Sequence, residues 1–122
     1  MRVVIFIFVF FIGTINATQS FISNDEYAKM LYKNPRGIGC DLCHGERGEG
    51  KVISSYIKGG KKISLVGPKI NDMSMRRFYR ALDRANRLMP DYFLTEEEKA
   101  YLYYYLTKQK NKIKVANVNK TE

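Results

Sequence analysis

The sequence predicts a mainly α-helical domain, and two observations carry this prediction. Apolar residues recur at helical spacing in three segments, near residues 24–34, 74–88 and 95–110. A single stretch, residues 52–66, alternates in the manner of β-strands. The chain has 122 residues, of which 45% are hydrophobic and 27% charged, a composition typical of one globular domain.

The N-terminal residues are predicted to be a signal peptide and not part of this domain. Arg2 precedes an apolar run from Val3 to Ile12, and small polar residues follow it. The run is shorter than the ~20 apolar residues that a membrane-spanning helix needs. We therefore expect residues 1–17 to be removed by cleavage after Ala17, and retention of this segment as a membrane anchor is the alternative.

The first and last predicted helices carry start signals. Ser23 or Asn24 can cap a helix that opens with acidic residues and ends before Pro35. Thr95 with Glu98 three residues later forms a capping box, which opens the final helix. These signals place a helix directly before the cysteine-containing segment and another near the end of the chain.

A hairpin and a further helix are predicted between them. β-branched residues flank Gly59 and Gly60, which favours a small hairpin. In residues 74–88, apolar residues occupy one helical face, and arginines occupy the opposite face at Arg76, Arg80, Arg84 and Arg87. This arginine face could guide acidic partners, or it could simply lie in solvent.

The segment CDLCH places Cys40 and Cys43 beside the only histidine of the chain. A disulfide between them would close a very small ring and would leave His44 without a role. A zinc site commonly has four ligands, and the sequence has no further Cys or His. A thioredoxin-like dithiol belongs to a strand-helix-strand context, whereas a helix is predicted before Cys40.

Covalent haem attachment gives every residue of this motif a role. The Cys40 and Cys43 thiols add to the two vinyl groups of the porphyrin, and His44 ligates the iron. One such motif predicts one haem c. A solvated CxxC beside a surface histidine is the remaining alternative.

A methionine is the expected second iron ligand. Met89 stands in a loop between two predicted helices, where its thioether can point inward. Met30 and Met75 lie on apolar helix faces, where packing is the expected role. We therefore favour Met89, with Met73 as a weaker candidate and a five-coordinate iron as a further alternative.

In the order of its motifs the chain resembles the class I cytochromes c over residues 25–108. The shared features are a helix before GCDLCHGERGEG, a GP pair in the next loop, a later Met-Pro pair, and a final helix in LTEEEKAYLYYYL. The resemblance implies a cytochrome c-like fold of three or four short helices wrapped around one covalent haem. The predicted β-hairpin departs from the minimal pattern of this family and would be a small insertion in that fold. The resemblance also implies that the Pro68 carbonyl accepts a hydrogen bond from His44, unless Pro68 is an ordinary loop proline.

Together these inferences predict a periplasmic electron carrier of a respiratory chain, and not an enzyme. Ligation by His44 and Met89 leaves no open iron position for a substrate. The formal charge of +9 favours acidic-surfaced redox partners such as a quinol-oxidising complex, a terminal oxidase or a peroxidase, and an exported chain is not expected to meet nucleic acid. No stable membrane insertion is expected after cleavage.

Two other functions stay open at this point. One is a small haem enzyme or ligand sensor with a labile distal position, for example in peroxide reduction. The other is a fixed cytochrome subunit of a membrane respiratory complex, held by a retained N-terminus. In each case residues 18–110 would form the cytochrome domain, and residues 111–122 a frayed polar tail. Tyr56, Tyr92 and Arg36 are candidate contacts for the haem propionates.

Overall fold

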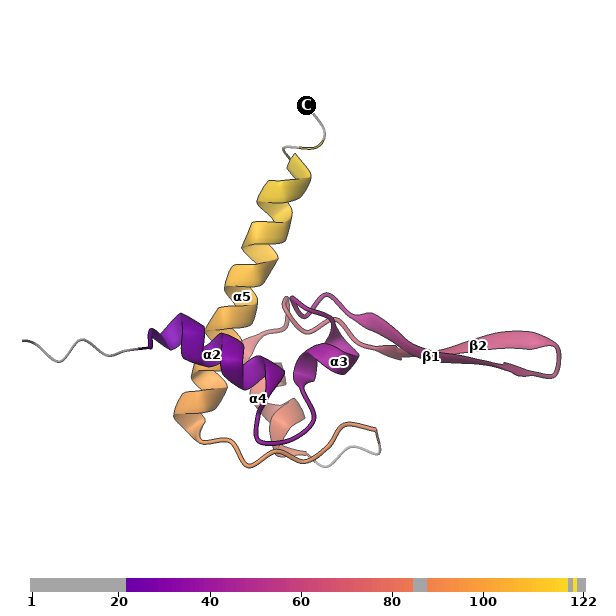
Figure 1. Ribbon diagram of the computed structural model, residues 1–122, viewed down its shortest axis with the longest axis horizontal. Coiled ribbons are helices and arrows are strands. Elements are labelled where there is room, and N and C mark those ends of the chain that lie inside the picture. The colour runs from indigo at the N-terminus through magenta and orange to yellow at the C-terminus, as the bar shows by residue number, and fades with distance from the viewer. Residues whose placement is uncertain (1–21, 85–87, 119, 121–122) are drawn as a thin grey trace, which may run out of the picture.

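The computed structural model describes residues 22–84, 88–118 and 120. The predicted signal peptide and Arg87 therefore lie outside the described residues. The elements follow in the order α2 (Asn24–Lys33), α3 (Cys40–His44), β1 (Lys51–Lys58), β2 (Lys61–Gly67), α4 (Met75–Asp83) and α5 (Glu96–Val118). Figure 1 shows the hairpin β1–β2 and the C-terminal half of α5 extending away from a body built around α2, α3 and α4.

The core lies where α2 and α4 pack against α5. Its buried side chains are Ala28, Leu31, Tyr32, Phe78, Leu102, Tyr105 and Leu106. The rings of Tyr32 and Tyr105 join α2 to α5 with their centroids 5.8 Å apart. Phe78 joins α4 to α5 through Tyr103, at 5.7 Å between centroids. Tyr104, in contrast, is 56% exposed, so the tyrosines of α5 divide between the core and solvent.

The predicted helix caps are confirmed. The Ser23 side chain accepts a hydrogen bond from the backbone N–H of Glu26 at 3.2 Å. The Glu98 N–H donates to Thr95 Oγ1 at 3.2 Å, and the Thr95 N–H donates to Glu98 Oε2 at 2.9 Å. These bonds satisfy backbone donors that have no partner within the first turn of a helix.

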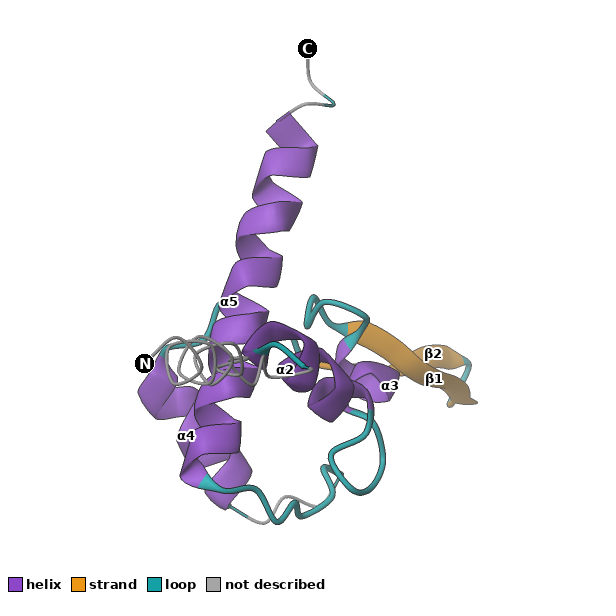
Figure 2. Ribbon diagram, turned by 60° about the vertical axis from the view of Figure 1, so that its left-hand side comes forward, coloured by secondary structure: helices purple, strands orange, loops and turns teal. Residues whose placement is uncertain are grey.

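The predicted hairpin is also confirmed. Strands β1 and β2 pair antiparallel, with Lys58 opposite Lys61 next to the turn. Gly59 and Gly60 both have positive φ, 58° and 74°. A two-residue hairpin loop with a type I′ turn requires positive φ at both of its central residues. Figure 2 shows the strands on the side of α3, away from α4.

The expected cytochrome c-like fold of three or four short helices is wrong. Helix α5 has 23 residues and continues past Lys110 to Val118, through much of the expected polar tail. The segment after Lys110 contains no Gly or Pro up to Val118, so nothing in it ends the helix. A two-stranded antiparallel sheet that projects outward from α3 completes a different architecture.

Candidate functional site

Close backbone packing fixes α3, the helix that carries the CDLCH motif. A Cβ atom on Gly39 would lie 2.5 Å from the Lys33 carbonyl oxygen at the end of α2. A Cβ atom on Gly67 would lie 1.7 Å from the carbonyl oxygen of Cys43. Only glycine fits at such distances, so the motif is held between α2 and the end of β2.

His44 is oriented by one hydrogen bond. Its side chain is buried, with 8% of the residue exposed, and Nδ1 lies 2.7 Å from the Pro68 carbonyl oxygen. A carbonyl oxygen only accepts, so Nδ1 carries a proton, and in the neutral ring the lone pair is on Nε2. The contact between His44 and Pro68 that the resemblance implied is therefore present. Such a bond fixes ring orientation and raises the basicity of the other nitrogen.

A cavity of about 650 Å³ opens beside this histidine. Cys40 and His44 line it together with Met73 and Met89. Its apolar wall consists of side chains from α2, α4 and α5, namely Tyr32, Phe78, Leu82, Leu102 and Leu106. The volume lies within the range of about 300–1,000 Å³ that is usual for small-molecule and cofactor sites.

The four methionines of the described residues lie in three different environments. Met89 and Met73 both line the cavity, so two thioethers reach it. Met75 lines a separate, shallow hollow with Arg76 and Tyr79. Met30 is 54% exposed, and its predicted place in the core is wrong because α2 turns Ala28, Leu31 and Tyr32 toward α5 instead.

The cavity wall is strongly basic on the side of α4. Lys69, Arg77, Arg80 and Arg84 line it, against one acidic residue, Asp72. Asp72 is paired with Lys69 at 2.9 Å, so the charge of the three arginines is not balanced within the lining. Arg80 and Arg84 belong to the predicted arginine face, whereas Arg77 was not among the residues predicted from the sequence. Its position three residues before Arg80 was the available signal.

The residues proposed from sequence as propionate contacts lie elsewhere. Tyr92 donates from its hydroxyl to the Ile38 carbonyl at 2.8 Å. Tyr56 is exposed on β1, and Arg36 pairs with Glu98. None of the three lines the cavity.

The two cysteines are free thiols in this structure. Both are half-buried, and Cys40 alone lines the cavity. Burial raises the pKa of the Cys40 thiol to about 11, so this thiol is protonated at neutral pH. Dithiol redox centres instead depend on a thiol with a lowered pKa. Within residues 22–84, 88–118 and 120, no group of three or more His, Cys, Asp or Glu side chains is placed to hold a metal ion.

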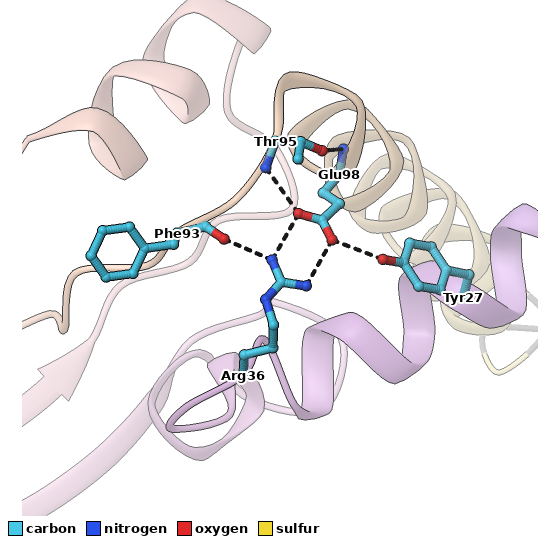
Figure 3. Close-up of polar contacts among 5 residues, drawn as sticks. All are labelled: Tyr27, Arg36, Phe93, Thr95 and Glu98. Atoms are coloured by element: carbon cyan, nitrogen blue, oxygen red, sulfur yellow. Dashed lines mark hydrogen bonds and ion pairs between the residues drawn. The ribbon is translucent and has the colours of Figure 1, made fainter.

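A polar network locks the loop before α3 to the start of α5. Arg36 donates through Nη1 and Nη2 to the Glu98 carboxylate, both at 2.8 Å (Figure 3). Arg36 Nη2 also donates to the Phe93 carbonyl, and the Tyr27 hydroxyl donates to Glu98 Oε1. The network thereby connects the segment before Cys40 with the loop that follows Met89.

We expect this network to make the stability of the protein fall at acidic pH. The hydrogen bonds from Arg36, supported by the Thr95 N–H and Tyr27, lower the pKa of Glu98 to about 2 from an ordinary 4.5. The ionised Glu98 carboxylate stabilises the folded protein fully above pH 4.5, and this stabilisation is lost as the pH falls toward 2. Glu98→Gln should lower the free energy of unfolding at pH 7 by about 2 kcal/mol, as measured by denaturant unfolding.

Glu26→Gln is the matched control for this prediction. Glu26 is an exposed carboxylate in the first turn of α2, and we expect its loss to cost below about 1 kcal/mol. Glu98→Gln should also flatten the dependence of stability on pH below 4.5. An unchanged pH profile in Glu98→Gln would show that other carboxylates govern acid unfolding.

No helix among the described residues is both long and apolar enough to cross a membrane.

Comparison with known proteins found no match to this chain among protein families, curated proteins or solved structures.

Proposed function

We propose that this chain is an exported, periplasmic carrier of single electrons with one covalently bound haem. The observation that carries the proposal is the buried His44, held by Pro68, at a cavity that Met73 and Met89 also line. Function depends on the chemistry of a site, so the proposal rests on these residues and not on the fold.

The residues of the cavity suit haem in their donor chemistry. The Cys40 and Cys43 thiols would each add across a vinyl group, with sulfur bonding to one carbon and the hydrogen going to the other. His44 Nε2 would hold the iron, and the Met89 thioether is our candidate for the second ligand. Bound haem would supply a one-electron redox centre.

The other residues that line the cavity would bind the haem propionates and affect the reduction potential of the haem. Arg77, Arg80 and Arg84 can pair with the two propionates, because guanidinium groups bind carboxylates through paired hydrogen bonds. Leu102 and Leu106 keep water from the wall formed by α5. A thioether ligand and an apolar wall both favour the reduced state, which suits a carrier that accepts electrons from membrane-derived donors.

An electron carrier accounts for these residues better than an enzyme does. With an imidazole and a thioether on the iron, no position is left for a substrate. The basic surface would bring the carrier to acidic redox partners, such as quinol-oxidising complexes, terminal oxidases or peroxidases. The predicted signal peptide supports a periplasmic location.

Absorption spectra with a potentiometric titration test this proposal. The exported protein should show a c-type haem spectrum and one reversible one-electron transition. Carbon monoxide should leave the spectrum of the reduced protein unchanged, because both axial positions are filled. A spectrum that changes at once with carbon monoxide would favour the ligand sensor or peroxide-reducing enzyme instead.

A further inference from the structure

The hairpin β1–β2 is a basic element without any acidic residue. Its lysines are Lys51, Lys58, Lys61 and Lys62, and residues 51–67 contain no Asp or Glu. All side chains of β1 are exposed, and so are most of those of β2. The tip lysines Lys58, Lys61 and Lys62 form no ion pair with any residue in the described part of the chain.

The hairpin also exposes apolar side chains to water. The exposed fractions are 78% for Ile57, 56% for Val52, 55% for Val66 and 53% for Tyr56. A two-stranded hairpin is marginally stable by itself in water, and this one gains little from burial. Tyr56 and Ile57 are successive strand residues on opposite faces, so both faces of the hairpin expose apolar side chains. Large exposed apolar surfaces often mark a site that binds a partner.

The arrangement of the lysines is unfavourable in water. Lys58 lies directly opposite Lys61 in the register of the strands, and Lys62 follows. Like charges in such a pair repel and destabilise a sheet. Anions held against the hairpin tip would remove this repulsion, so the arrangement favours an anionic partner.

The chemistry of the hairpin favours a lipid surface over a protein. Protein interfaces are depleted in lysine at their centres and enriched in Arg and Trp, and the hairpin contains only lysine as its cation and no Trp. Lysine side chains can keep their ammonium groups among lipid phosphates while their stems and the neighbouring apolar residues lie deeper.

We propose that the β1–β2 hairpin binds the surface of an anionic membrane. The hairpin reaches outward from α3, and the contact between Gly67 and Cys43 joins it to the CDLCH motif. Binding would therefore hold the motif close to the membrane surface. This inference goes beyond the electron-carrier proposal and does not depend on haem.

Co-sedimentation with vesicles tests the proposal. The exported protein should bind equimolar phosphatidylglycerol and phosphatidylcholine vesicles at low salt, and should bind pure phosphatidylcholine much more weakly. Lys58→Glu combined with Lys61→Glu should weaken binding to the anionic vesicles by at least about 30-fold, since two favourable charges are lost at about 1 kcal/mol each and two repulsive charges are added. High salt should reduce this difference.

Helix α5 provides matched controls. Lys112→Glu with Lys114→Glu makes the same change in net charge on another exposed, basic element, and should weaken binding less than threefold. Ile57→Ser should weaken binding about tenfold, whereas Val115→Ser, which also changes an exposed apolar residue, should have little effect. Every variant carries the same N-terminus, so a retained residue 1–17 segment would affect all of them equally.

Two outcomes would overturn the proposal. One is an equal loss of binding in the hairpin and α5 charge variants, which would mean that only net charge matters. The other is unchanged binding of the hairpin charge variant to the anionic vesicles, which would mean that the hairpin does not contact the lipid surface. Neither outcome bears on whether haem is bound.

Discussion

Met89→Ala should abolish the sulfur-to-iron charge-transfer band of the oxidised protein. Met89 lines the cavity beside His44 and stands in the loop between α4 and α5. Loss of its thioether should lower the reduction potential by on the order of 0.2 V, within the range of about 0.8 V that axial ligands span. The reduced variant should then bind carbon monoxide, which a spectrum detects directly.

Met73→Ala is the decisive comparison, because Met73 lines the same cavity. We expect this variant to keep the band and most of the potential. Met75→Ala serves as a control outside the cavity and should behave like the unaltered protein. Loss of the band in Met73→Ala but not in Met89→Ala would make Met73 the ligand and our assignment wrong.

Arg80→Glu with Arg84→Glu should slow electron transfer with an acidic redox protein by tenfold or more at low ionic strength. Both arginines are exposed on the α4 side of the cavity, close to the site where the electron would leave. Opposite charges raise association rates through long-range attraction, and salt screens this attraction. The difference from the unaltered protein should therefore close as the ionic strength rises.

Lys112→Glu with Lys114→Glu separates this local effect from net charge. The two double variants carry the same charge, and stopped-flow kinetics compares their second-order rate constants. We expect the α5 variant to lose less than threefold. The comparison requires variants with a normal haem spectrum, because Arg80 and Arg84 are also our candidate propionate contacts. Equal rates in both variants, or a normal rate in the Arg80 and Arg84 variant, would leave these arginines without a docking role.

Local signals in the sequence were enough to predict most of the secondary structure. The Ser23 cap and the capping box of Thr95 and Glu98 act within four residues, and the structure contains the hydrogen bonds they imply. The Gly59-Gly60 pair likewise dictates a turn by its own backbone freedom. Such features are set by neighbours in the chain, so a single sequence reveals them.

The overall fold was not predictable in the same way. Helix α5 continues past Lys110 because no residue that ends a helix follows it up to Val118. The polar composition of this segment had instead suggested a frayed tail. The position of Met30 depends on which face of α2 meets α5, and that is a property of packing between distant segments. The resemblance in motif order led to a fold that the structure does not have.

The candidate site was predictable only in its local part. CDLCH and the Gly-Pro pair could be read directly, and the structure brings His44 to the Pro68 carbonyl. That Met73 and Arg77 line the same cavity as Met89 depends on how α4 packs over this cavity. Both follow from the burial of Phe78 against α5, which no short sequence pattern specifies.

The central claim, one covalent haem on Cys40 and Cys43, is tested most directly by the mass of the denatured protein. The chain should be produced with its export signal and a working haem-attachment system. We predict a mass that exceeds the polypeptide by one haem, and a loss of this increment when Cys40 and Cys43 are both replaced by alanine. A denatured mass equal to the polypeptide alone would contradict the proposed function.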